Sequence, residues 1–437
     1  MAKSGSAAAA DAGARIRMYR VGFGDFFLLS VPAEGGGMAH VLIDCGVHAH
    51  DLGVMDEAVA QLKADTDGRL ALVIMTHRHA DHISGFGSAR EIFETFQVER
   101  VWMSWFEKPD DKEAAAIQAG IVATAQHLQS ALAARAKPDE EEFAHMAENA
   151  LGVAKKGGNA AALEMLHSFK TPDGGPTPVD YYAADETPTL PPSLVSAGLQ
   201  AEILGPPRDL ALVAQMDNAA HQYLASDDAG DEDGPTGPFS SAYRVAGFDW
   251  AEPLFPLDQI RKNIEKWQPK VLAAAAQRAD NALNNQSLVV LFTLRGKTML
   301  FSGDAQWGNW ANFLFGGPIG TPGHTALTEK SQSILANLDF YKVGHHGSTN
   351  ATPMDVVEAM RKGCVAMCST DAGAYGKEAR GTEVPRIPLM TALSEKTQNQ
   401  LARSDQVAVG KEPANDKVAA LAAPFKDAGN GCIDYWL

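Results

Sequence analysis

The most informative run of residues is Leu70-Ala71-Leu72-Val73-Ile74-Met75, followed directly by Thr76-His77-Arg78-His79-Ala80-Asp81-His82. The first six residues are continuously apolar and partly β-branched, which predicts a buried strand. Four potential metal ligands follow, at a strand end of the kind where α/β proteins gather functional groups. The alternating spacing lets His77 and His79 converge on one divalent ion, while Asp81 and His82 face a second. A surface histidine cluster is the alternative, and the HxHxDH spacing favours the metal site.

Strand patterns continue on both sides of this run. A helical spacing at 54–62 lies between two of them and predicts a strand, helix, strand unit. The predicted strands are two at 16–31 joined by a glycine turn at 21–25, then 40–44, 195–204, a hairpin of 287–293 with 298–301, and 340–343, 364–369 and 432–436. This mixture predicts an α/β fold.

The 437 residues are long enough for one large domain with insertions. We expect a disordered N-terminus at 1–14 and a single domain over 15–437. An Ala, Glu, Lys and Gln-rich region predicts a helical insertion at about 107–192, which ends in a Pro-rich loop at 172–192. A second insertion at 208–281 contains an acidic, Gly-rich stretch that we expect to be partly mobile. Either insertion could narrow access to a site or bind a protein partner.

The composition excludes several classes of protein. There are 37 Lys and Arg against 54 Asp and Glu, a net charge of −17, with 45% hydrophobic residues. This composition excludes wholesale disorder, and the negative charge opposes non-specific binding to nucleic acids or anionic membranes. Four cysteines without a CxxC pair predict reduced thiols, and no apolar run reaches the length of a membrane span. We therefore expect a cytoplasmic protein without membrane contact.

Two further strands are also followed by potential metal ligands. The runs are Phe301-Ser302-Gly303-Asp304 and Val343-Gly344-His345-His346-Gly347-Ser348. The first run alone is a weak signal, since Gly-Asp after a strand is usually a turn, and the histidine pair alone is of middling specificity. Three strand ends that each supply His or Asp are what a hydrolytic site with two metal ions requires.

Together these motifs resemble the metallo-β-lactamase superfamily. Within it, the likeness is greatest to the metallo-β-lactamase domain of ComEC-type DNA-uptake proteins and their soluble relatives. It rests on HRHADH and on residues 21–25, 285–289, 302–304 and 342–348. The resemblance implies a four-layered αββα sandwich, with the metal ions at one edge.

The resemblance also implies roles for individual residues. The metal ligands would be His77 and His79 on the first ion, Asp81 and His82 on the second, Asp304 as a bridge, and His346 completing the second site. His345 would point into the pocket and contact the substrate or its developing negative charge, although the order of His345 and His346 stays open. Asp44 would orient a ligand histidine by accepting a hydrogen bond from its ring N–H, and Asp25 would hold the first turn near the metal loops. Asp81 or Asp304 would pass a proton to the leaving group.

The chain departs from this family at two places. No segment displays the additional histidine that many members place before the bridging acid; His127, His145, His167 and His221 are expected at the surface. A His-Pro pair near the end of ComEC-type domains is replaced by Arg386-Ile387-Pro388. Lys342 and Arg386 are candidates for phosphate contacts, with solvated surface charge as the alternative.

The predicted activity is hydrolysis by a water that two divalent ions activate. Zinc suits the histidines, and manganese or iron suits the carboxylates. The ComEC-like motifs indicate a phosphodiester substrate: DNA, a nucleotide or a small phosphodiester. A carbon-ester, lactone or lactam hydrolase of the same fold is the first alternative. A degenerate site on a protein-binding platform is the second, and the sequence leaves the oligomeric state open.

Overall fold

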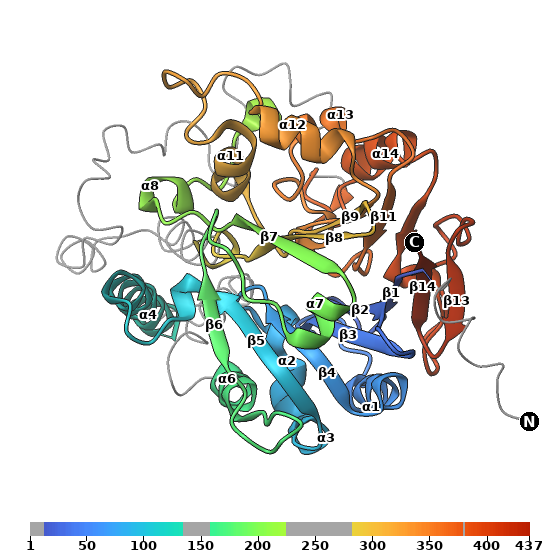
Figure 1. The fold of residues 1–437 in the computed structure, drawn as a ribbon. Coiled ribbons are helices and arrows are strands. Elements are labelled where there is room, and N and C mark those ends of the chain that lie inside the picture. Colours follow the sequence, from blue (N-terminus) through green and yellow to red (C-terminus); the bar gives the residue numbers. More distant parts are fainter. Residues whose placement is uncertain (1–12, 134–157, 224–281, 379–380) are drawn as a thin grey trace, which may run out of the picture.

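The computed structural model describes residues 13–133, 158–223, 282–378 and 381–437. Within these ranges the strands form two sheets, one of eight strands and one of six. Figure 1 shows the sheets at the centre of the molecule with helices on either side. The predicted mixed α/β architecture is therefore confirmed.

The larger sheet has the order β13-β14-β1-β2-β3-β4-β5-β6. Neighbours are antiparallel from β13 to β3 and parallel from β3 to β6. The strands are β1 (Arg15–Tyr19), β2 (Phe26–Pro32), β3 (Met38–Cys45), β4 (Arg69–Met75), β5 (Gln97–Ser104), β6 (Val179–Tyr182), β13 (Lys426–Gly429) and β14 (Cys432–Trp436). The parallel run brings the carboxyl ends of β3 and β4 to the same edge.

The smaller sheet has the order β12-β11-β10-β9-β8-β7. Its strands β9 to β12 are parallel, and β7, β8 and β9 are joined antiparallel. The strands are β7 (Leu199–Gly205), β8 (Val289–Leu294), β9 (Lys297–Phe301), β10 (Phe340–Lys342), β11 (Val365–Cys368) and β12 (Leu401–Arg403). The predicted hairpin is β8 and β9, and it turns at Arg295 and Gly296.

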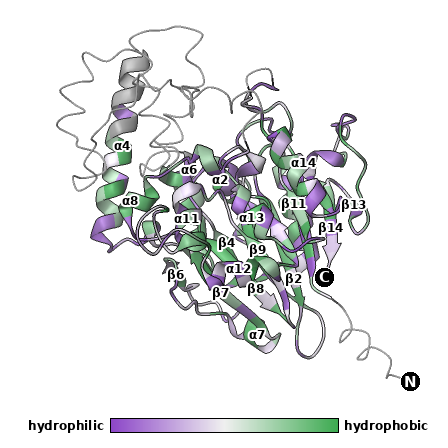
Figure 2. Ribbon diagram, turned by 90° about the horizontal axis from the view of Figure 1, so that it is seen from above, coloured by the Kyte–Doolittle hydropathy of each residue, from purple (hydrophilic) through white to green (hydrophobic). Residues whose placement is uncertain are grey.

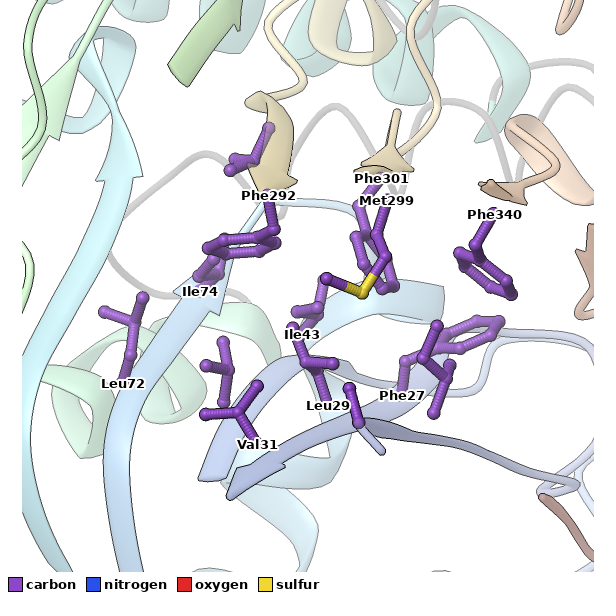
Figure 3. Packing of buried hydrophobic residues seen from close by; sticks show 14 of the residues in the cluster. Phe27, Leu29, Val31, Ile43, Leu72, Ile74, Phe292, Met299, Phe301 and Phe340 are labelled. Atoms are coloured by element: carbon purple, nitrogen blue, oxygen red, sulfur yellow. The ribbon is translucent and has the colours of Figure 1, made fainter. Parts of the chain in front are cut away.

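The main core lies between the two sheets. Alternate residues of β2, such as Phe27 and Leu29, face Phe301 and other side chains of the second sheet (Figure 3). The intervening residues Phe26 and Leu28 belong to a second buried cluster under the helices. Because both faces are covered, the strand is apolar at every position except the buried Ser30 and does not alternate with polar residues.

Helices cover the outer face of each sheet. The helices on the larger sheet are α1 (Met55–Thr66), α2 (Ala80–Ser88), α3 (Arg90–Phe93) and α6 (Gly158–Ser168). Those on the smaller sheet are α11 (Trp307–Phe315), α12 (Glu329–Ala336), α13 (Met354–Ala359) and α14 (Ile387–Lys396). In Figure 2 the central strands are mostly hydrophobic, and hydrophilic residues lie chiefly on the surrounding helices and loops. This arrangement leaves the strand ends as the place for polar groups.

Short elements and one long helix complete the described chain. Helix α4 (Lys112–Ala133) buries Ala114, Ile117 and Ile121 at helical spacing against Trp105 and Phe106. The remaining elements are α7 (Pro192–Ser196), α8 (Leu210–Val213) and the 3₁₀ turns η1 (Trp105–Glu107), η3 (Ala219–His221), η5 (His345–Gly347) and η7 (Ser404–Gln406).

The predicted helical insertion at 107–192 needs correction. Its residues Ala162, Met165 and Leu166 on α6 are buried in the cluster under the larger sheet, and β6 is the edge strand of that sheet. The segment 172–192, expected as a loop, contains this strand. Pairing with β5 explains the difference, because a four-residue edge strand between prolines carries little local signal.

Most of the predicted N-terminal tail and parts of both predicted insertions lie outside the described residues. This holds for positions 1–12 and for the acidic stretch at 227–234. Of the second insertion, only 208–223 is described, as α8 and η3 with their connections. In the described part of the chain, no helix combines the length and the apolar character needed to cross a membrane.

Candidate metal centre

Five strand ends meet at one edge of the two sheets. Asp44 closes β3, the HxHxDH run follows β4, and Asp304 follows β9. His345 and His346 follow β10, and Ser369 follows β11. Each residue therefore lies near the carboxyl end of a parallel strand, where backbone hydrogen bonding stops and side chains turn to a common point.

Four of the predicted ligands form one cluster. His82 Nε2 lies 3.1 Å from Asp304 Oδ2, and His346 Nε2 lies 3.0 Å from Asp81 Oδ2 and 3.6 Å from Asp304 Oδ2. One ligand atom from each of these four residues lies within 4.8 Å of all the others. Asp304 contacts both imidazoles, so it is the central carboxylate of the cluster.

His77 and His79 form a pair beside this cluster. His77 Nε2 lies 3.0 Å from His79 Nδ1, and the His77 ring lies 4.1 Å from the His82 ring, centroid to centroid. Both rings are buried. The oxygen atoms of Thr76 and Ser287 lie 3.2 and 3.3 Å from His77 Nδ1, which fixes the ring orientation.

Asp44 binds the outer nitrogen of His82. Its Oδ2 lies 2.7 Å from His82 Nδ1 and accepts a hydrogen bond from Thr76 Oγ1, while its Oδ1 accepts one from the Thr76 amide. A carboxylate in this position holds an imidazole so that Nε2 faces the ligand side. His346 is held similarly, since its Nδ1 lies 2.9 Å from the Ser369 carbonyl oxygen.

Asp25 and Lys342 form a buried ion pair behind the cluster. Lys342 is 2% exposed, and its ammonium also lies 3.8 Å from Asp304 Oδ1. The alternative of solvated surface charge is therefore wrong for Lys342. The Asp25 amide donates to the Asp81 carbonyl oxygen, at 2.8 Å, which ties the first glycine turn to the metal loop.

Backbone geometry explains two features of the motifs. His345 and His346 both have positive φ, 42° and 53°, a rare conformation that costs energy for residues other than glycine. It turns the two side chains apart, so His346 enters the cluster while His345 lies beside it. At Gly303, an added Cβ would approach Thr76 Cβ to 2.9 Å. Glycine there lets the ends of β4 and β9 approach each other and places Asp304 next to His82.

His345 lies at the exposed side of the centre. Its Nε2 is 3.9 Å from Asp304 Oδ2, and its side chain is 24% exposed, against 14% for Asp81 and at most 1% for His82, Asp304 and His346. Solvent thus reaches the cluster past His345 and Asp81. Of the two histidines, the structure places His346 in the four-residue cluster that could hold a metal ion.

The charges of the cluster perturb its acids and bases. Burial opposes ionisation of Asp304, but the positive charges of His82 and His346 hold its pKa well below the usual range. Burial likewise opposes ionisation of Asp81, and His82 together with the hydrogen bond from His346 holds the pKa of Asp81 well below its usual value. Burial disfavours a charged His82, yet Asp304 and Asp44 raise the pKa of His82 well above its usual value.

These shifts describe a centre with excess negative charge. Among the described residues, the ion pairs of Asp25, Asp44, Asp81 and Asp304 include one permanent cation, Lys342. Protonated imidazoles or a divalent cation can offset the difference, because buried charges of one sign repel strongly. A divalent ion would replace those protons at neutral pH.

The side chains present fit a divalent ion. His82 Nε2 and Asp304 Oδ2 are buried and lie 3.1 Å apart, and neither has a hydrogen-bond partner among the described residues. Such unsatisfied atoms are rare and mark an ion or a water. Imidazole nitrogens and carboxylate oxygens together are typical ligands of zinc, manganese or iron.

Several residues considered in the sequence lie elsewhere. His221 stacks on Trp307 and lies 2.6 Å from Asp355, and the exposed His167 contacts Tyr181. His145 and the side chain of His127 lie outside the described part. Arg386 is 2% exposed and paired with Glu383, so surface charge is wrong for it too.

Some residues near the centre were missed. Thr76, Ser287 and Ser369 orient the imidazoles, and Asn284 lies against His345. Their only sequence signal is their position beside strand ends that already carry ligands. Comparison of the chain with family models and with curated proteins found no match.

Proposed function

We propose that the protein is a metal-dependent hydrolase with a metallo-β-lactamase-type αββα sandwich, and that it acts on a phosphodiester. The observation that carries the proposal is the buried cluster of Asp81, His82, Asp304 and His346, whose ligand atoms lie within 4.8 Å of one another. The succession of helices, sheet, sheet and helices supports the proposed fold. The ComEC-like motifs quoted above support the substrate class.

The described residues supply distinct parts of the reaction. Bound divalent ions, zinc first, would supply an activated water and a counter-charge for the phosphate. Asp81, His82, Asp304 and His346 would hold one ion, and His77 with His79 would contribute to another. Asp44, Thr76 and the Ser369 carbonyl keep the imidazoles oriented.

Hydrolysis forms a bond from the water oxygen to phosphorus and breaks the bond to the leaving oxygen, which takes up a proton from the water. Asp81 is the cluster carboxylate nearest to solvent, so it is the one placed to hand that proton on. His345 lies at the exposed edge of the cluster, where its ring can contact the substrate beside the phosphate. Lys342 is paired with Asp25 and makes no phosphate contact in this proposal.

The test is metal content by elemental analysis together with hydrolysis of bis(p-nitrophenyl) phosphate. We expect about two divalent ions per chain, and an activity loss of at least ~100-fold in Asp81→Ala. Asp185→Ala is the matched control, because this carboxylate is 77% exposed and contacts only Lys330 among the described residues. It should behave as wild type.

Other outcomes separate the alternatives. If the protein binds metal and hydrolyses p-nitrophenyl acetate or a lactone but not the phosphodiester, the substrate is a carbon ester and not a phosphodiester. If the protein binds no metal and shows no turnover that Asp81→Ala reduces, the proposal of an enzyme is wrong and a protein-binding platform is favoured.

A further inference from the structure

Asn284 occupies an unusual position beside the metal centre. It precedes β8, and its neighbour Leu283 is buried in the cluster formed by Trp105, Phe106 and α4. Asn284 itself is 1% exposed. Its carboxamide Nδ2 lies 3.4 Å from His345 Nε2, so the amide is aimed at the exposed edge of the centre.

The contacts of His345 determine which amide atom faces it. Ser348 Oγ lies 2.7 Å from His345 Nδ1 and donates to Asn350 Oδ1, which itself lies 3.1 Å from Nδ1. Both partners therefore accept from an Nδ1 proton, and Nε2 carries the lone pair in the neutral ring. The Asn284 NH₂ group donates to that lone pair, and Oδ1 points elsewhere.

Asn284 Oδ1 is buried and makes no hydrogen bond to any described residue. The adjacent Asn285 gives the contrast: its Nδ2 donates to the carbonyl oxygens of Val213 and Gln215, and its Oδ1 accepts from the amides of Gln306 and Asn309. A buried carbonyl oxygen left without a donor is unfavourable in the free protein. Such an atom beside a reactive centre is typical of a group that awaits a ligand.

We infer that Asn284 Oδ1 accepts a hydrogen bond from the substrate, from an O–H or N–H group on the part that flanks the scissile phosphodiester. This inference rests on the proposed function and narrows its substrate class. The substrate is a phosphodiester with a donor near the phosphate, such as the hydroxyl of a sugar or the N–H of a nucleobase. His345, which the amide contacts through Nδ2, is 24% exposed at its side chain, so the amide lies one residue away from solvent.

The experiment compares two substrates that release the same p-nitrophenolate. Bis(p-nitrophenyl) phosphate carries no O–H or N–H group when ionised, whereas the p-nitrophenyl ester of thymidine 5′-phosphate carries a 3′-hydroxyl and a base N–H. In the metal-loaded protein, we expect Asn284→Ala to lower kcat/KM about tenfold for the thymidine ester and less than threefold for the other. Metal content and Tm should stay at wild-type values.

Two further variants make the result decisive. Asn284→Asp keeps an acceptor oxygen, and its added charge affects both monoanionic esters alike, so the wild-type ratio between the substrates should return. Asn284→Leu has a similar shape without polar atoms and should show the alanine result even if the alanine variant folds poorly. A 3′-deoxythymidine ester separates the sources: loss of the wild-type preference identifies the hydroxyl, and its retention identifies the base N–H.

An equal loss on both substrates in Asn284→Ala, or no loss on either, would overturn the inference. The proposed function fails in a different way, through a metal-loaded wild type that hydrolyses neither ester.

Discussion

Lys342 shows how burial changes the role of a charged side chain. Burial lowers the stability of its charged form, but Asp25 and Asp304 raise the pKa of Lys342 above its usual value. Burial raises the pKa of Asp25 even with Lys342 beside it. The ammonium is therefore a permanent positive charge beneath the ligand carboxylates.

Removal of either member of this pair leaves a buried charge without its partner. We expect Lys342→Met to lower the free energy of unfolding by about 3–5 kcal/mol, and Asp25→Asn by a similar amount. The double variant should recover part of the loss. Urea unfolding of the four proteins in a double-mutant cycle measures the coupling, and strictly additive losses would contradict the pair.

His40 provides a pH-dependent contribution away from the centre. It is buried, with Nδ1 2.9 Å from Ser30 Oγ, and burial together with Arg15 lowers its pKa to about 4. Between this value and about 6.5, the unfolded chain binds a proton that the folded chain does not, so stability rises with pH. As the pH falls from 6.5 to 4, the protonation of His40 in the unfolded chain should therefore lower the free energy of unfolding by up to ~3 kcal/mol.

The matched variant is His40→Asn, which keeps a polar side chain without an ionisable ring. Its free energy of unfolding, measured with urea at pH 7, 5.5 and 4.5, should fall less steeply than that of wild type. Parallel curves would show that His40 titrates normally in the folded protein.

At the scale of elements, the segment before β8 joins the sheets to the centre. Leu288 donates through its amide to the Thr76 carbonyl oxygen, and Ser287 Oγ accepts from the Asp304 amide. This one segment links the ends of β4, β8 and β9. The asparagines of this segment therefore help to position the strand ends around the site, and they are not among the proposed metal ligands.

Asn285 connects this segment to its neighbours through side-chain hydrogen bonds. Asn285→Ala would remove four hydrogen bonds to the backbone of neighbouring segments, although the Gln215 carbonyl oxygen would still accept from the Gly308 amide. Each buried group that loses its partner costs about 1–3 kcal/mol. We expect a loss of at least ~3 kcal/mol in unfolding free energy. Asn284→Ala, with its unsatisfied oxygen, is the control and should lose less than ~1 kcal/mol. Equal losses would contradict this division of roles.

At the scale of the whole molecule, the net charge of −17 and the acidic centre have the same sign. A divalent cation bound at the centre offsets repulsion that the folded chain retains and the unfolded chain relieves. Removal of the metal with a chelator should therefore lower Tm. Readdition of zinc to a free concentration of 100 times its dissociation constant should raise the free energy of unfolding by about 2.7 kcal/mol.

Differential scanning calorimetry in matched buffers measures this effect, and His82→Ala provides the comparison because it removes a central side chain of the cluster that could hold the ion. The variant should show little response to chelator or zinc. An equal response in the variant would place the stabilising metal elsewhere.

The sequence alone determined the strands around the centre and the strand-end placement of the ligands. Hydrophobic runs such as 70–75 report burial, and the HxHxDH spacing reports ligand chemistry, and both are local properties. Strand β5 and the edge strand β6 were not recognised, because pairing with neighbours distant in sequence stabilises them.

Only the tertiary structure decided how the ligands combine. It placed His346 in the cluster, with His345 beside it, and it buried Lys342 against Asp25 instead of leaving it at the surface. It also showed that two adjacent asparagines differ: Asn285 is hydrogen-bonded to neighbouring segments, whereas the carbonyl oxygen of Asn284 has no partner among the described residues. These outcomes depend on contacts between segments tens to hundreds of residues apart, and local sequence carries no record of which partner a buried polar atom finds.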